Sequence, residues 1–138
     1  MAYVIGVDCG TSGTKTVLFR EDGTVMASAT VEYPMYQPKN GYAEQDPADW
    51  YNAAVNTIKG VIAKSGVSKE DIVGVGLSGQ MHGLVMLDEN NEVIRKSIIW
   101  CDQRTAAEVE EMNEKVGREK LIEITANPAL TGWTAAKI

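Results

Sequence analysis

The sequence predicts an α/β fold in which a mixed sheet is flanked by helices. Three short strand-like segments come first, separated by polar turns, and they predict an antiparallel meander. A long amphipathic helix follows, and a further apolar strand comes after it. A strand, a helix and a second strand in this order imply a crossover connection, which adds a parallel strand to the antiparallel ones.

The first two strands, expected over residues 3–8 and 16–19, are joined by a loop of small and polar residues. Buried aliphatic residues carry Asp8 to the mouth of this loop, where Gly10 and Gly13 leave backbone N–H groups that can approach an anion closely. The sequence therefore predicts a phosphate-binding hairpin tip. The remaining polar side chains of the loop are those of Thr11, Ser12, Thr14 and Lys15.

A single carboxylate in a phosphate-binding loop needs a role of its own, because its charge alone would repel the anion. Mg²⁺ is commonly held by one or two carboxylates, waters and the oxygens of a nucleotide. We therefore expect Asp8 to organise Mg²⁺ through water and Lys15 to contact phosphate. The alternative is an ordinary hairpin, in which Asp8 caps the turn and Lys15 is solvated.

Two better-known phosphate-binding motifs are excluded. A P-loop has glycine directly before its lysine and a helix after it, whereas here Thr14 precedes Lys15 and a strand follows. Residues 74–79 match the dinucleotide pattern G-x-G-x-x-G, but the residues after them predict a strand and a turn instead of a helix. The hairpin tip remains the candidate phosphate site.

The composition indicates a soluble globular protein. The chain has 138 residues, of which 44% are hydrophobic and 23% charged, and this length suits one domain. A net charge of −6 with scattered basic residues argues against nucleic acid as a partner. No apolar run approaches the roughly 20 residues of a membrane span, and no signal peptide begins the chain, so we expect a cytoplasmic protein. Cys9 and Cys101 are too few for a disulfide framework.

The middle of the chain predicts a third strand over residues 24–33, a loop to residue 45 and then a long helix. Asp46 is a suitable N-cap and Pro47 suits the first turn, while Gly66 ends the helix. One apolar stripe is expected to pack on the sheet. It consists of Trp50, Ala53, Ala54, Thr57, Ile58, Val61 and Ile62.

The second half of the chain predicts a strand over residues 72–78, apolar enough to lie centrally in a sheet. A further hairpin is expected over residues 84–94 and a short strand over 97–100. Residues 105–115 and 118–126 predict two helices with solvated charged faces.

Four segments resemble the carbohydrate kinases that include glycerol kinase, ribulokinase, gluconokinase and xylulokinase. They are Gly6–Lys15, Glu44–Trp50, Gly79–Gly83 and Ile99–Thr105. The third segment has the form found in xylulokinases. Residues 131–137 also resemble the T-G-F-T-A-P-K element of the family, with tryptophan and alanine at its third and sixth positions. The resemblance implies the actin-like, ribonuclease-H-like ATPase fold.

The resemblance also implies a two-domain enzyme with ATP in its cleft. Residues 1–138 are then the N-terminal part of the first, sugar-binding domain, and the catalytic base lies in a second domain outside this chain. We expect ATP-dependent phosphorylation of a pentulose, D-xylulose to D-xylulose 5-phosphate, and no activity in the isolated chain. The partners are then a sugar and ATP; oligomeric state stays open, with a homodimer of the full-length protein as one alternative.

Sugar contacts are expected in two of the resembling segments. A neutral imidazole at His82 offers a donor and an acceptor to hydroxyls, although from spacing alone a structural role is favoured; Met81 offers an apolar wall. Arg104 has two alternatives, contact with the ligand or support of Asp102. The expected sugar-binding residues are Gln80, Met81, His82, Trp100, Asp102 and Arg104.

Two other functions compete with a pentulose kinase. A kinase for gluconate or another sugar acid is the first, because the Gln80–His82 tripeptide also occurs there, although no lysine-rich clamp for a carboxylate is present. A non-catalytic, actin-like nucleotide-binding module is the second, and the sugar-contact segments argue against it.

Overall fold

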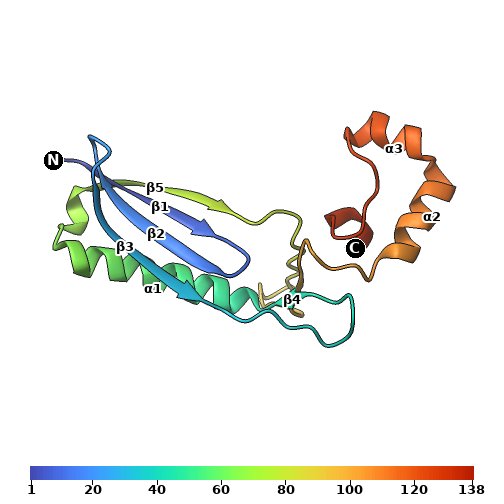
Figure 1. Cartoon of the computed structure of the whole chain (residues 1–138), viewed down its shortest axis with the longest axis horizontal. Coiled ribbons are helices and arrows are strands. Elements are labelled where there is room, and N and C mark those ends of the chain that lie inside the picture. The colour runs from blue at the N-terminus through green and yellow to red at the C-terminus, as the bar shows by residue number, and fades with distance from the viewer. The chain divides into compact units, whose positions relative to one another are not determined.

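The structure is a computed structural model that describes residues 1–138, and it divides into two compact units. The sheet unit comprises residues 1–34 and 48–80, and the second unit comprises residues 35–47 and 81–138. The second unit thus takes the loop before the long helix together with the C-terminal half of the chain (Figure 1).

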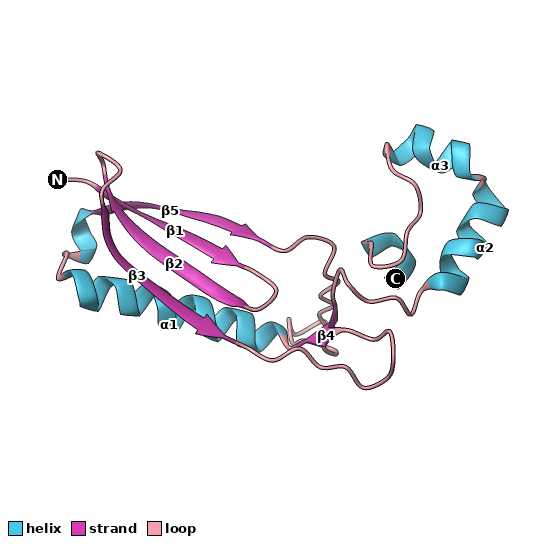
Figure 2. Ribbon diagram, viewed as in Figure 1, coloured by secondary structure: helices cyan, strands magenta, loops and turns pink.

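The sheet unit contains a four-stranded mixed sheet with the strand order β3-β2-β1-β5 (Figure 2). β1 and β2 are antiparallel, as are β2 and β3, whereas β1 and β5 are parallel. The predicted meander and crossover are therefore confirmed. The strands are β1 (Tyr3–Cys9), β2 (Gly13–Arg20), β3 (Val25–Glu32) and β5 (Ile72–Gly79).

The predicted long helix is α1 (Pro47–Ser65), which runs along one face of this sheet (Figure 1). It begins at the predicted proline, and Gly66 follows its end with a φ of 67°. The buried core between this helix and the sheet consists of Ile5, Val7 and Leu18 from the strands and Val61 from α1. Burial of each such aliphatic side chain stabilises the fold by about 1.5–3 kcal/mol before entropy is subtracted.

A buried hydrogen bond of 2.6 Å joins the hydroxyls of Thr16 in β2 and Thr57 in α1. The Thr57 hydroxyl also donates to the carbonyl of Ala53, so the polar groups of this contact are satisfied. The helix is thus registered on the sheet by a polar contact as well as by its apolar stripe.

The prediction that residues 72–78 form a central strand is wrong within this chain. β5 lies at the edge of the sheet, where the side chains of Val75 and Leu77 are 55% and 82% exposed. Its parallel pairing with β1 supplies backbone hydrogen bonds on one side only. The apolar composition of a strand indicates that the strand can be buried. Whether it is buried depends on the elements that pack against it.

The second unit contains a two-stranded sheet of β4 (Glu44–Gln45) and β6 (Ser97–Ile98). The two predicted helices are confirmed as α2 (Ala106–Val116) and α3 (Arg118–Thr125), and a 3₁₀ helix, η2, spans Thr134–Lys137. A second short 3₁₀ helix, η1 (Lys69–Asp71), precedes β5 in the sheet unit.

The predicted hairpin over residues 84–94 is present only in part. The turn closes through hydrogen bonds between Asp88 and Glu92, but the flanking residues form only an isolated bridge between Leu87 and Val93. Two strands alone are marginal, because they bury little apolar surface. None of the helices is long and apolar enough to cross a membrane.

Candidate functional site

The predicted phosphate loop is the tight connection between β1 and β2. The Gly10 N–H donates to the carbonyl of Gly13 over 3.1 Å, which closes the turn. This corrects the expectation that both glycine N–H groups are open to an anion, because the Gly10 donor is already used. At the base of the loop, Asp8 in β1 lies opposite Lys15 in β2, and both side chains are exposed. The carboxylate and the ammonium therefore flank the same turn.

Gly13 is the position in this loop where a side chain has no room. A Cβ atom built there lies 2.7 Å from the carbonyl oxygen of Val31 in β3. This distance is shorter than real Cβ contacts allow, and the opposing atom belongs to backbone that is paired with β2. The close approach of β3 therefore requires glycine where the loop enters β2.

Tyr33, which directly follows β3, holds the loop between β1 and β2 through hydrogen bonds. Its hydroxyl donates to the Gly10 carbonyl over 2.5 Å and lies 3.5 Å from both Cys9 Sγ and Thr14 Oγ1. Its N–H donates to the Ser12 carbonyl over 3.4 Å. Burial raises the pKa of the Tyr33 hydroxyl to about 12, so this group stays a hydrogen-bond donor at neutral pH.

The role expected for Thr14 in the loop differs from the one that its contacts with Tyr33 favour. Thr14 is fully buried and its hydroxyl faces Tyr33, which favours a supporting role over phosphate contact. The sequence held no signal for Tyr33 beyond its place at the end of a predicted strand, because its partners lie some twenty residues earlier in the chain.

The parallel strands β1 and β5 end at the same edge of the sheet, where the loop begins. Asp8 is paired with Ser78 and Cys9 with Gly79, and the Gln80 N–H donates to the Cys9 carbonyl over 3.0 Å. Gln80, predicted as a sugar-binding residue, is thus fixed beside the start of the phosphate loop. Ligands of open α/β sheets commonly bind at the carboxyl ends of parallel strands.

The donors near the loop fit a nucleotide-bound magnesium ion better than a site made of protein ligands alone. No group of three or more histidine, cysteine, aspartate or glutamate side chains is placed to hold a metal. Asp8 offers a single exposed carboxylate. Mg²⁺ keeps several waters and needs only one or two carboxylates beside phosphate oxygens, so this donor set suits it.

In the second unit, Asp102 is completely buried and its oxygens are occupied by protein donors. The Ala43 N–H donates to Oδ2 over 2.6 Å and the Arg104 N–H to Oδ1 over 2.9 Å. The Arg104 guanidinium adds contacts of 2.7–3.0 Å to the two oxygens. This geometry favours the alternative in which Arg104 supports Asp102 over the one in which Arg104 contacts the ligand, and it leaves the expected sugar contact of Asp102 with oxygens that already accept from protein donors.

Burial by itself would raise the pKa of the Asp102 carboxyl, but the hydrogen bonds from Arg104 and Ala43 outweigh it and hold this pKa below its usual value. Arg104 is fixed in turn by an ion pair of 2.8 Å with Glu44 and by the ring of Tyr42, whose centroid lies 3.8 Å from Cζ. The loop before α1 is thus connected to the predicted sugar segment through one guanidinium group.

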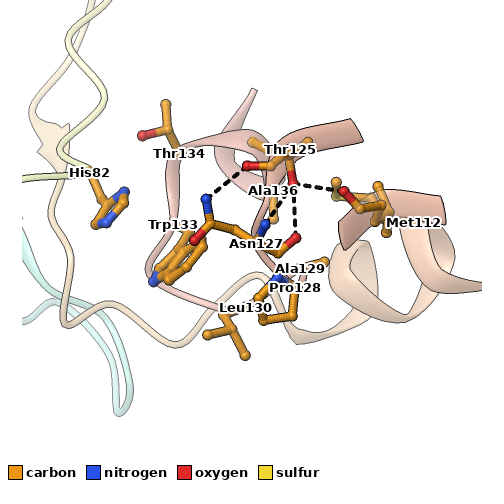
Figure 3. A pocket seen from close by; sticks show the side chains of 12 residues that line it. His82, Met112, Thr125, Asn127, Pro128, Ala129, Leu130, Trp133, Thr134 and Ala136 are labelled. Atoms are coloured by element: carbon orange, nitrogen blue, oxygen red, sulfur yellow. Dashed lines mark hydrogen bonds between the residues drawn. The ribbon is translucent and has the colours of Figure 1, made fainter. Parts of the chain in front are cut away.

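The other predicted sugar residues of this unit are more accessible. Met81 and Trp100 are 72% and 49% exposed. The His82 ring stacks on the indole of Trp133, with 4.9 Å between ring centroids and an interplanar angle of 4°. The two rings lie side by side at one end of a cavity of about 190 Å³ (Figure 3). The backbone of His82 has a φ of 62°, which is uncommon outside glycine.

Comparison with known proteins identifies the family. Residues 3–138 match the model of the N-terminal domain of the FGGY family of carbohydrate kinases. This chain belongs to the FGGY family. The predicted fold class is confirmed with it, since solved structures of FGGY kinases, which have the actin-like ATPase fold, match this chain.

Individual relatives in the FGGY family cover most or all of this chain but are much longer. The xylulose kinase of Bacillus subtilis (strain 168) is 44% identical over 138 residues, which are 100% of this chain and 28% of that protein. The xylulose kinase structure from Rhodospirillum rubrum matches with a TM-score of 0.92 and 31% identity, covering 98% of this chain and 28% of its own. The gluconate kinase structure from Lactobacillus acidophilus matches with a TM-score of 0.80 and 31% identity, covering 88% and 24%.

Proposed function

We propose that this chain is the N-terminal part of the first, sugar-binding domain of an ATP- and Mg²⁺-dependent pentulose kinase that converts D-xylulose to D-xylulose 5-phosphate. The observation that carries the proposal is the loop between β1 and β2, with Asp8 and Lys15 flanking its base and Gln80 bonded beside it. Membership of a carbohydrate kinase family supports phosphoryl transfer to a sugar, and the similar xylulose kinases support a ketopentose.

In phosphoryl transfer a protein mainly positions the reactants and neutralises charge. Asp8 would hold Mg²⁺ through water, and the ion when bound neutralises phosphate charge. Lys15 and the hydroxyl groups of Thr11 and Ser12 would contact the terminal phosphate. Thr14 and the glycines give the loop its shape, and Tyr33 keeps that shape in place.

The sugar would be bound by the exposed side chains of the second unit. Met81 would form an apolar wall, His82 would exchange hydrogen bonds with hydroxyl groups, and Trp100 would stack on C–H faces. Asp102 and Arg104 would hold the segment that carries Trp100, since their charges are already paired. The catalytic base would lie in a part of the enzyme outside these residues.

The first test is a substrate screen with the full-length enzyme against xylulose, ribulose, glycerol and gluconate. We expect the highest kcat/KM on xylulose. Faster turnover of gluconate would overturn the pentulose assignment and favour a sugar-acid kinase, the second candidate, which the match to a gluconate kinase structure supports.

The second test separates the sugar contacts from the nucleotide contacts in the same enzyme. His82→Ala and Met81→Ala should raise KM for the sugar about tenfold or more while KM for ATP changes little. Asp8→Asn should instead lower kcat and weaken the response to Mg²⁺. The reverse pattern would remove these side chains from their assigned roles.

A non-catalytic nucleotide-binding module is the remaining alternative. Isothermal titration of the full-length protein with xylulose distinguishes it from a kinase. A heat of xylulose binding that saturates as sugar is added would support the kinase. If the protein shows no affinity for the sugar even in the presence of nucleotide, the result would support the non-catalytic module.

A further inference from the structure

We propose that Lys137 is a positioning residue that holds His82 in the conformation needed to meet the sugar. Its ammonium group lies in the second unit and donates to three backbone carbonyl oxygens at once. The acceptors are His82 at 2.7 Å, Ile98 at 3.1 Å and Ile99 at 3.1 Å. The consequence for sugar binding rests on the proposed function.

The hydrogen bonds of the Lys137 ammonium group fit a positioning role better than simple packing. An ammonium group has three N–H donors, and here each of them has a carbonyl partner. The side chain is buried, and this burial lowers the pKa of its amine because the charged form loses water. A buried charge is costly unless it is well coordinated, so an apolar side chain would suffice if the position only filled space.

The group that Lys137 binds most closely is one whose backbone is strained. The φ of 62° at His82 places a residue with a bulky side chain in the left-handed region, a conformation that costs free energy for residues other than glycine. A hydrogen bond of 2.7 Å from a charged donor to the carbonyl of this same residue offsets that cost. Such strain at a ligand contact persists only where the surroundings hold it.

Lys137 also connects both partners of the ring stack. Trp133 lies immediately before η2, whose last residue is Lys137, and the Lys137 amine binds the backbone of His82. The His82 and Trp133 rings are nearly parallel, at 4° (Figure 3). Stacking occupies a face of the imidazole, while its nitrogens lie on the ring edge. Lys137 therefore fixes the direction in which the His82 nitrogens point.

The spectroscopic test uses the 138-residue chain, in which His82 is the only histidine. Selective labelling of histidine makes its ring C–H resonances unambiguous in NMR spectra, and stacking on an indole shifts them upfield. A Trp133→Leu variant supplies the unstacked reference. In Lys137→Met, which keeps an unbranched side chain one atom shorter and removes its donors, we expect the resonances to move most of the way to that reference.

The matched control is Lys115→Met, an exposed lysine on α2, which should leave the His82 resonances unchanged. The backbone amide resonances of α2 and α3 report whether the second unit, which contains Lys137 and His82, stays folded. If Lys137→Met does not fold, Lys137→Arg keeps a charged donor and should keep the resonances nearer to wild type than to the reference. Resonances that stay at the wild-type position in Lys137→Met, or that reach the reference in a folded Lys137→Arg, would overturn the proposal.

A kinetic test in the full-length enzyme checks the consequence for the sugar. Lys137→Met should raise KM for xylulose about tenfold while KM for ATP stays within about twofold, since Lys137 touches neither substrate. Equal losses for both substrates would overturn the positioning role. If the wild-type enzyme phosphorylates no sugar, the proposed function fails, and the NMR result decides the role of Lys137 by itself.

Discussion

Three side chains of this chain fix the local geometry around predicted site residues. Tyr33 binds the Gly10 carbonyl, Arg104 binds Asp102, and Lys137 binds the His82 carbonyl. In each case a polar side chain holds a short irregular segment that secondary structure does not fix. Such segments have few backbone hydrogen bonds of their own, so a side chain that supplies one stabilises a specific conformation.

Tyr33→Phe tests the support of the phosphate loop. The variant keeps the ring and removes the hydroxyl that donates to Gly10, so the free energy of unfolding should fall by about 1 kcal/mol. Urea denaturation measures this change. Tyr51→Phe is the matched control, because Tyr51 is 72% exposed and its variant should unfold like wild type. Equal stability of all three proteins would contradict the role of the hydroxyl.

Asp102→Asn tests the buried charge cluster through its pH dependence. Removing the charge leaves Arg104 paired with Glu44 alone and should cost about 3 kcal/mol at pH 7. Because the folded pKa of Asp102 lies below its unfolded value, its contribution is complete above about pH 4 and is lost as the pH falls through the folded pKa. The difference between variant and wild type should therefore shrink in acid.

Urea denaturation of both proteins between pH 7 and pH 3 checks this prediction. Glu108→Gln on the exposed face of α2 is the control for removing one negative charge. A difference that stays constant down to pH 3 would show that the carboxylate charge of Asp102 is not what stabilises the unit.

At the scale of elements, the kind and order of helices and strands follow from local patterns. α1 begins at Pro47 and is followed by Gly66, while Gly117, with a φ of 90°, separates α2 from α3. Proline at a first turn and glycine after a helix act through their own backbone preferences, so these boundaries could be predicted. The position of β5 within the sheet could not be predicted in this way. A central position requires a neighbouring strand on each side, and no local pattern shows whether both neighbours are present.

Gly13→Ala tests the packing of β2 against β3 where the loop begins. The added methyl meets the Val31 carbonyl at 2.7 Å, so the strand pair must shift and stability should fall by about 1–3 kcal/mol. Gly74→Ala on β5 is the matched control, because a Cβ there meets no atom within 4 Å. Thermal unfolding compares them, and an equal effect of both substitutions would contradict the steric account.

At the scale of the whole molecule, this chain spans about 28% of the length of the curated xylulose kinases that it matches. The predicted site residues fall into two groups, one in each compact unit, and each group has its own supporting contacts. The β1–β2 loop and the segment around His82 are therefore each held by contacts within their own unit.

The 138-residue chain should not phosphorylate xylulose, because under the proposed function the catalytic base and the adenosine pocket would lie outside these residues. A coupled assay for ADP release, with the full-length enzyme as the positive control, measures this. Turnover above the level of an Asp8→Asn chain would contradict the proposed division of labour between the parts of the enzyme.

The sequence by itself determined the α/β class, the order of the elements, the small-residue loop and the family, because each depends on residues close together in the chain. It also identified His82 and Met81 as candidates, through a short motif. Only the tertiary structure decided that the Gly10 N–H closes the turn, that Asp102 is held by Arg104 and Ala43, and that Tyr33 and Lys137 bind the carbonyls of Gly10 and His82. The physical reason is distance along the chain. Tyr33 and Gly10 are 23 residues apart, and Lys137 and His82 are 55 apart. No local pattern encodes such hydrogen bonds, which form only after the chain has folded.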